Sequence, residues 1–359
     1  MKKVLVAMSG GVDSSVAAAL LQKQGFFVVG GYMKNFSRES WEGVLETDCP
    51  WEKDVADVQA VCEKLNIEFQ SFNFENEYRD QVIEYFFKGY ASGRTPNPDI
   101  MCNKEIKFGL FLDKAMELGF DHVATGHYVR VRERKTQGSI LKTFEMLKGV
   151  DPKKDQSYFL YALDQRQLSK TLFPVGDYTK IQVRQMAREF GLPNAEKKDS
   201  QGLCFVGHIN LREFLKQRIP ERVGEIVDHS GKVIGTHPGA WYYTIGQRQG
   251  LGIGGGQPYY VSQKDVITNK LMVVTSEYGG LVHHTQATVN EIHWIDEVPI
   301  LPLKCHAKIR YQQKDQNCEI TQVDNTYLVN FEQSQFAIAP GQSIVFYDNN
   351  HALGGGVIS

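Results

Sequence analysis

The chain of 359 residues has an ordinary globular composition, 42% apolar and 23% charged, which leaves room for two or three domains with substantial cores. Its net charge of −2 excludes a broad basic field, so any contact with nucleic acid must use local basic patches. No apolar run approaches the length of a membrane span and no export signal can be recognised. We therefore expect a cytoplasmic protein with no membrane partner and with mostly reduced cysteines.

The first predicted elements are a buried strand over residues 3–8 and a helix over 16–24. Between them lies a loop of small residues, Ser9-Gly10-Gly11-Val12-Asp13-Ser14-Ser15. Adjacent glycines let a phosphate approach the backbone, and the free N–H groups and dipole of the helix start favour its charge. The serine hydroxyls of the loop are expected to add further donors. The alternative is an ordinary strand–turn–helix without a ligand.

The loop is neither a Walker A sequence, since it lacks the Lys-Ser/Thr ending, nor a Gly-x-Gly-x-x-Gly fingerprint. It resembles the pyrophosphate loop (PP-loop) of the ATP pyrophosphatases, which cleave ATP between the α and β phosphates. We predict that it binds ATP. Asp13 is expected to hold Mg²⁺ on the phosphates, because magnesium prefers carboxylate and phosphate oxygens.

Strand-like runs alternate with helical periodicity up to about residue 205. The predicted strands cover 27–33, 68–74 and 122–131. The predicted helices cover 54–65, 77–90, 103–118, 166–172 and 179–190. This alternation predicts an α/β domain with a parallel sheet and helices on both faces.

Beyond about residue 215, short alternating strands are separated by glycine and asparagine turns. They are predicted at 224–228, 259–262, 304–311, 318–323, 326–331 and 343–348. Such a pattern is typical of small β-barrels. We predict an ATP-binding catalytic domain over 1–212, a small central β-rich domain over 213–278 and a carboxyl-terminal β-barrel over 279–359.

The six cysteines are scattered and form no Cys-x-x-Cys pair, so neither a structural zinc nor an iron–sulfur cluster is expected. Four of them are interpreted as small buried hydrophobic residues, namely Cys49, Cys62, Cys305 and Cys318.

Cys102 and Cys204 differ from the other cysteines in their surroundings. Two prolines precede Cys102 and a helical pattern follows it, so we expect the thiol near a helix amino terminus with a lowered pKa, helped by Lys104 and Lys107. Asp99 is close enough to take a proton, although it could instead cap the helix. Cys204 follows two lysines in a loop flanked by glycines, which again suits an accessible, activated sulfur. Each cysteine alone could be a buried hydrophobic residue, but beside an ATP loop the pair suggests thiolation.

Six motifs, taken in order, resemble the bacterial tRNA-specific 2-thiouridylase family over essentially the whole chain. They are the loop 9–15 and the segments 95–108, 124–128, 154–160, 198–205 and 246–255. The resemblance implies that ATP adenylates position 2 of the wobble uridine in tRNAs for lysine, glutamate and glutamine. Sulfur, delivered as a persulfide by a sulfur-relay donor protein, then displaces AMP.

The resemblance also implies the roles of both cysteines and two sets of contacts. Cys204 would carry the persulfide, and Cys102 would be the nucleophile that frees hydrosulfide or leaves a Cys102–Cys204 disulfide. The implied ATP site comprises Ala7, Met8, Ser9, Gly10, Gly11, Val12, Asp13, Ser14, Met33 and Gly126. The target base would contact Asn97, Pro98 and Asp99, and the anticodon stem-loop would contact His127, Lys154, Asp155, Gln156, Arg310, Tyr311 and Gln342.

Some of these residues also have structural interpretations. His127 could be a core histidine, and Arg310 and Tyr311, expected on a strand, could be ordinary surface residues of a barrel. Ala7 stands where the family often has glycine, which matters little unless the backbone needs a positive φ. The segment 36–51 fits the family poorly and receives no role.

Two other functions stay open at this level. An amide-forming ligase with the same ATP loop would need neither Cys102 nor Cys204. A non-catalytic RNA-binding protein would show no tRNA-dependent release of pyrophosphate.

Overall fold

The computed structural model describes residues 1–37, 51–134, 142–198, 210–254 and 256–359. Its first domain is built on a five-stranded sheet with the order β3-β2-β1-β4-β7, in which every neighbouring pair is parallel. The strands are β1 (Lys3–Ala7), β2 (Phe27–Lys34), β3 (Glu68–Asn73), β4 (His122–Ala124) and β7 (Thr171–Leu172). The predicted parallel sheet is confirmed.

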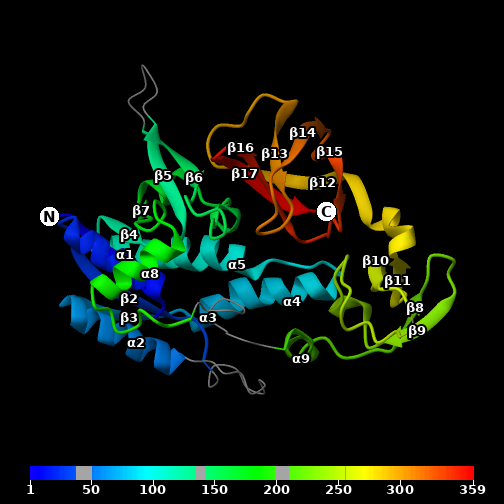
Figure 1. Cartoon of the computed structure of the whole chain (residues 1–359), viewed down its shortest axis with the longest axis horizontal. Helices are drawn as coiled ribbons and strands as arrows, with labels where there is room; N and C mark the ends of the chain where they lie inside the picture. Colours follow the sequence, from blue (N-terminus) through cyan, green and yellow to red (C-terminus); the bar gives the residue numbers. More distant parts are fainter. Residues whose placement is uncertain (38–50, 135–141, 199–209, 255) are drawn as a thin grey trace.

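Side chains of β1 alternate between two apolar cores, as the period of two in a strand requires. Val4 and Val6 pack with one set of helices, and Leu5 packs with the other. The first face is covered by α1 (Val12–Lys23), α2 (Trp51–Leu65) and α8 (Lys180–Glu189). The second face is covered by α3 (Glu75–Tyr78), a π-helical turn (Arg79–Ile83), α4 (Glu84–Ala91), α5 (Pro98–Met101), a π-helix (Cys102–Leu110) and α6 (Phe111–Glu117). Figure 1 shows α1, α2 and α8 beside the sheet at its left, and α4 and α5 in its centre.

The single strand predicted over 122–131 is wrong. β4 ends at Ala124, and the chain turns through Thr125–Tyr128 before β5 (Val129–Arg134) begins. β5 forms an antiparallel hairpin with β6 (Thr143–Lys148), and β6 pairs in turn with the last strand of the chain. The hairpin of the first domain thus extends the sheet of the carboxyl-terminal barrel (Figure 1).

The central region holds a four-stranded sheet with the order β10-β11-β8-β9. Its strands are β8 (Gly224–Val227), β9 (Val233–His237), β10 (Tyr259–Asp265) and β11 (Lys270–Thr275). Short helices connect the domains, namely α7 (Gln165–Ser169), α9 (Leu211–Lys216) and 3₁₀ turns at Ser157–Phe159, Ala240–Tyr242 and Ser276–Val282.

The last region is a closed barrel. Its strands are β12 (His283–Trp294), β13 (Leu303–Lys308), β14 (Gln316–Val323), β15 (Thr326–Phe336), β16 (Ser343–Asp348) and β17 (His351–Ile358). β12 pairs with both β15 and β17, which closes the ring and confirms the predicted barrel. The sequence prediction missed β17, because its Gly354-Gly355-Gly356 run is atypical of strands. These glycines are required because a Cβ at Gly354 would lie 2.1 Å from the carbonyl oxygen of His293.

Three of the four cysteines interpreted as hydrophobic are buried, which confirms that interpretation for Cys62, Cys305 and Cys318. Burial raises the pKa of Cys62 to about 11. Cys49 lies outside the described residues. Within the part of the chain that the structure covers, no helix is both long and apolar enough to cross a bilayer.

Candidate active site

The loop between β1 and α1 has the backbone geometry of an anion site. Gly10 has φ of +73°, and a Cβ there would lie 3.0 Å from the carbonyl oxygen of Asp54, so glycine is required twice over. Gly11 is the N-cap of α1, which begins at Val12, four residues earlier than predicted. The first N–H groups of α1 have no side-chain cap, so they can meet a phosphate.

The serine hydroxyls of this loop shape the backbone. Ser14 Oγ and Ser15 Oγ each donate to the carbonyl oxygen of Gly11 at 3.1 Å, and Ser14 Oγ accepts from Ser9 N at 3.3 Å. In this structure the hydroxyls of Ser14 and Ser15 donate to the main chain, and their expected donation to a ligand stays a prediction. Their hydrogen bonds fix the main chain between Ser9 and Ser15, and the main-chain N–H groups of the loop are then its donors.

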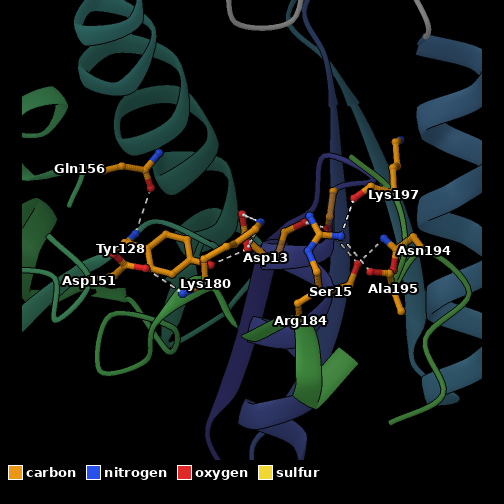
Figure 2. Close-up of polar contacts among 12 residues, drawn as sticks. Asp13, Ser15, Tyr128, Asp151, Gln156, Lys180, Arg184, Asn194, Ala195 and Lys197 are labelled. Carbon is orange, nitrogen blue, oxygen red and sulfur yellow. Dashed lines mark hydrogen bonds and ion pairs between the residues drawn. The ribbon is translucent and has the colours of Figure 1, made fainter. Parts of the chain in front are cut away.

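Asn194 fastens the loop from outside, and the sequence prediction missed it. Its side-chain nitrogen donates to the carbonyl oxygen of Gly10 and to Ser15 Oγ, both at 2.9 Å (Figure 2). The residue follows α8 and is buried. Only tertiary structure brings it to a loop 184 positions earlier, so no local signal could have found it.

Asp13 lies in the first turn of α1 and faces two further residues that were not predicted. Lys180 Nζ lies 2.8 and 2.9 Å from its two carboxylate oxygens, and the hydroxyl of Tyr128 donates to Asp13 Oδ1 at 2.7 Å (Figure 2). The described residues contain no group of three or more metal-ligating side chains. A metal ion here would take most of its ligands from phosphate and water.

Two residues of the implied ATP site, Ala7 and Met33, lie in one apolar core cluster. Ala7 ends β1 opposite Gly31 and is not among the residues with positive φ, so its methyl group fits the strand. Gly126 has a different reason to be glycine. A Cβ there would lie 2.5 Å from Ser14 N, so the Thr125–Tyr128 turn packs directly against the start of α1.

His127 joins this turn to the helix that carries Cys102. Its Nδ1 lies 2.8 Å from Thr125 Oγ1, and its ring centroid is 5.8 Å from that of Phe108. Burial and the charge of Lys107 hold the pKa of His127 well below its usual range. The ring is therefore neutral near pH 7 and stays partly accessible.

Cys102 is fully buried, with an exposure of 0%. Asn97 is the N-cap of α5 and accepts from Asp99 N at 3.2 Å, so the alternative of Asp99 as the cap is wrong. The helix starts at Pro98, which puts Cys102 one turn further along than predicted. The expected accessible thiol is not seen in this structure. Cys102 shares its apolar cluster with Ala7, so the two predicted sites meet in one core.

Cys102 also begins a nine-residue π-helix that nothing in the sequence had indicated. The carbonyl oxygen of Phe108, within this π-helix, accepts a hydrogen bond from Gln167 Nε2 at 2.9 Å, and Asn103 Nδ2 donates to the carbonyl oxygen of Phe159 at 3.2 Å. Such π-helical turns are frequent at functional sites. Here the turn is held from α7 and from the 154–160 motif.

Both β-domains hold the segment that leads to Cys102. Thr95 N donates to the carbonyl oxygen of Pro340 at 2.8 Å, and Gln342 Nε2 donates to the carbonyl oxygen of Thr95 at 2.7 Å. From the central domain, Thr244 Oγ1 lies 3.1 Å from Thr95 Oγ1. The side-chain amide of Gln342 thus joins the barrel to the segment from Thr95 to Cys102, called the Cys102 segment below.

Two residues of the Lys154–Gln156 motif point inward. Asp155 is buried, accepts from Gly149 N and Ser157 N at 3.1 Å and lies 3.5 Å from Lys308 Nζ. Gln156 Oε1 accepts from Tyr128 N at 3.0 Å (Figure 2). Lys154 is half-buried. The motif therefore links the barrel to the Asp13 contacts.

Arg310 and Tyr311 lie beyond the end of β13, so their expected place on a strand is wrong. Arg310 is exposed and donates to the carbonyl oxygen of Phe336 at 2.7 Å. The ring of Tyr311 is 4.5 Å from that of Phe159, so it packs on the 154–160 motif.

Cys204 lies outside the described residues, as does its motif after Lys198. The chain just before it is firmly held. Lys197 Nζ lies 2.8 Å from Asp54 Oδ1 and 2.6 Å from Asp57 Oδ2, in the first turns of α2.

Comparison with known proteins gives family models for three consecutive parts of the chain. They are described as tRNA methyl transferase HUP domain (residues 2–208), tRNA methyl transferase PRC-barrel domain (212–275) and Aminomethyltransferase beta-barrel domain (284–358). Two curated proteins, each named tRNA-specific 2-thiouridylase MnmA, are similar over full length. That of Pseudomonas fluorescens (strain Pf0-1) is 49% identical over 99% of this chain and 94% of its own. That of Methylobacillus flagellatus is 49% identical over 100% and 99%.

The chain belongs to the tRNA-specific 2-thiouridylase family. Two model descriptions mention methyl transfer, but identity over the whole length of the 2-thiouridylases is the more specific finding. A solved 4-thiouridine synthetase–RNA complex with bound ATP aligns at 17% identity with a TM-score of 0.37, covering 61% of this chain and 50% of that one. That likeness is too weak to bear on the 2-thiouridylase assignment.

Proposed function

We propose that this 2-thiouridylase replaces oxygen by sulfur at position 2 of the wobble uridine in tRNAs for lysine, glutamate and glutamine. It is a tRNA sulfurtransferase that uses ATP. The observation that carries the proposal is the 49% identity to tRNA-specific 2-thiouridylases over the whole chain. An anion site at the start of α1 supports it. Because its substrate is tRNA, we place the reaction in the cytoplasm.

The first step makes the uridine oxygen a leaving group. The O2 atom attacks the α-phosphorus of ATP, a new O–P bond forms, and the bond from the α-phosphorus to the bridging oxygen breaks to release pyrophosphate. The segment Ala7–Ser14 would hold ATP, with the loop N–H groups on the phosphates, and Met33 and Gly126 would line the adenosine. Asp13 fits Mg²⁺, because it lies in the first turn of α1 and its carboxylate keeps a lone pair beyond those used by Lys180 and Tyr128. A bound Mg²⁺ would supply charge neutralisation on the pyrophosphate.

The second step needs both cysteines. A sulfur-relay donor protein would load Cys204 as a persulfide, and Asp99, three residues before Cys102 in the chain, would take the proton from the Cys102 thiol. In one route the Cys102 thiolate attacks the inner sulfur and frees hydrosulfide, which adds to C2 and expels AMP with the original oxygen. In the other, the outer sulfur attacks C2 and expels AMP, and Cys102 then attacks the inner sulfur to release the thiouridine. Both routes leave a Cys102–Cys204 disulfide, which an external thiol reductant must reopen.

We assign the tRNA contacts by exposure. Asn97 and Asp99 are partly exposed, so with Pro98 they would receive the uridine after it leaves its stack. His127, Lys154, Arg310 and Tyr311 would contact the anticodon stem-loop. Asp155, Gln156 and Gln342 would act by holding these segments, since their polar side-chain atoms are engaged within the protein. We keep the domains as 1–212, 213–278 and 279–359.

The test is mass spectrometry of unmodified tRNA incubated with the enzyme, ATP, Mg²⁺ and a persulfide donor. We expect a mass gain equal to one sulfur-for-oxygen exchange, located at the wobble uridine and dependent on ATP. Parallel reactions contain S-adenosylmethionine in place of ATP. No sulfur gain under turnover conditions, or a methyl gain with S-adenosylmethionine, would defeat the proposal.

An amide-forming ligase, the alternative with the same ATP loop, is disfavoured by the full-length identity to 2-thiouridylases. It predicts that a double Cys102→Ser, Cys204→Ser variant keeps full activity, since nitrogen transfer needs no thiol. Our proposal predicts that this variant binds ATP and makes no thiolated tRNA.

A further inference from the structure

The cationic side chains of Lys180, Arg184 and Lys197 lie near the start of α1, and they differ in what they contact (Figure 2). Lys197 is neutralised by two carboxylates of α2. Arg184 donates to the carbonyl oxygens of Ala195 and Lys197 at 3.1 and 3.0 Å, which fixes the chain after α8. Lys180 instead contacts Asp13, the acidic residue of the loop itself.

Lys180 is held in place through both its main chain and its ammonium group. It is the first residue of α8, directly after the Thr179 cap, and its N–H donates to Asp151 Oδ2 at 2.9 Å. Its side chain is 13% exposed, and Nζ lies 2.8 and 2.9 Å from the two oxygens of Asp13. A long flexible side chain is thus held beside the first turn of α1.

We propose that Lys180 binds the β- and γ-phosphates of ATP and the pyrophosphate that leaves. This inference rests on the proposed ATP-dependent function and adds a ligand to it. The loop has no lysine of its own, and two of its hydroxyls are turned to the carbonyl oxygen of Gly11. A side-chain cation that shares the phosphate charge with Mg²⁺ would therefore come from elsewhere in the fold, and α8 brings Lys180 next to Asp13.

The ion pair between Lys180 and Asp13 would be exchanged for contacts with Mg²⁺ and phosphate when ATP binds. In the structure Lys180 and Asp13 neutralise each other. With ATP and Mg²⁺ bound, the Asp13 carboxylate would hold the metal, and the Lys180 ammonium would lie on the phosphate oxygens. Lys180 makes and breaks no covalent bond. Its charge stabilises pyrophosphate as the bond to the α-phosphorus breaks, while the AMP half gains nothing from it.

This asymmetry defines the experiment. Binding of inorganic pyrophosphate and of AMP, each with Mg²⁺, is measured by titration calorimetry on the full-length protein. Lys180→Met removes the charge and keeps the length of the stem, Lys180→Arg restores a cation, and Lys170→Met changes an exposed lysine elsewhere on the domain as the control. We expect Lys180→Met to weaken pyrophosphate binding by about tenfold or more, the value of a charged hydrogen bond, and to leave AMP binding unchanged. Lys180→Arg should recover most of the affinity.

Kinetics give a second readout. Product inhibition of tRNA-dependent AMP formation by pyrophosphate should weaken in Lys180→Met by the same factor as the binding, whereas inhibition by AMP should not.

Two results would overturn the inference. One is pyrophosphate affinity unchanged in Lys180→Met. The other is an equal loss of pyrophosphate and AMP binding together with a lower melting temperature, which would make Lys180 a structural partner of Asp13 only. Failure of the wild-type protein to release pyrophosphate in the presence of tRNA would instead defeat the proposed function, so the two failures are distinguishable.

Discussion

The ATP loop and the Cys102 segment lie at the same parallel sheet but are built in different ways. The ATP loop connects β1 directly to α1, so its geometry is set within one short segment. Its donors are the main-chain N–H groups at the start of α1. The Cys102 segment is held by two other domains through Thr95, and its thiol is fully buried. Under the proposed function, adenylation would use a loop whose N–H donors the structure already shows, whereas sulfur transfer would require the buried Cys102 thiol to become accessible.

The largest effect should come from removing the thiol of Cys102. We expect Cys102→Ser to lower the rate of thiolation by roughly 10³-fold or more, since a covalent step is lost, while ATP binding stays intact. Quantification of 2-thiouridine by mass spectrometry checks this. The matched control is Cys62→Ala, a buried cysteine on the other face of the sheet, which should lose about 1 kcal/mol of stability and no activity. A Cys102→Ser enzyme that still thiolates would contradict the comparison.

Asp13→Asn should strike the preformed site alone. The variant removes the charge that faces Lys180 and would hold Mg²⁺, so we expect the apparent affinity for ATP with Mg²⁺ to fall by about 10- to 100-fold. Calorimetric titration measures the change. Asp121→Asn is the control, because Asp121 accepts from Lys3 N at the opposite end of β1. Equal ATP affinity in the two variants would remove Asp13 from the site.

The pH dependence of stability tests the turn between the two regions. The pKa of His127 is far below its usual range in the folded protein, because burial and Lys107 disfavour the imidazolium. As pH falls through about 6.5, the unfolded chain takes up a proton that the folded chain refuses, so stability decreases toward acid by up to about 1.4 kcal/mol per pH unit. Urea unfolding between pH 7 and pH 5 should show a shallower decrease for His127→Gln than for His284→Gln, an exposed histidine. Identical slopes would show that His127 titrates normally.

The smallest effect is expected from the hydrogen bond between Gln342 and Thr95. Gln342→Ala removes this bond to the carbonyl oxygen of Thr95, which should lower the free energy of unfolding by about 1 kcal/mol. If the barrel positions Cys102, thiolation should slow several-fold while KM for ATP stays constant. Gln333→Ala, an exposed residue of the same barrel, is the control. A rise in KM for ATP without slower thiolation would contradict the division between the two regions.

The features that could be predicted from the sequence are those that a local residue pattern encodes. The glycine-serine loop, the parallel sheet and the closed barrel follow from period, turn residues and composition within short windows. The side chains that contact the Asp13 carboxylate could not be predicted. Tyr128 and Lys180 lie 115 and 167 positions from it in the sequence, and no local pattern marks them. The π-helix at Cys102 was missed because it depends on tertiary partners such as Gln167. The break after Ala124 was missed because Gly126 is dictated by contact with α1, a constraint invisible within its own segment.

Sulfur transfer is proposed to need the thiols of both Cys102 and Cys204. Peptide mass mapping after a single turnover tests this requirement most directly. The persulfide-loaded enzyme is mixed with ATP, Mg²⁺ and tRNA in the absence of reductant, quenched in acid and digested without reduction. We predict one disulfide, between Cys102 and Cys204, formed in proportion to the thiolated tRNA. Thiolated tRNA formed with Cys102 still carrying a free thiol would contradict the account.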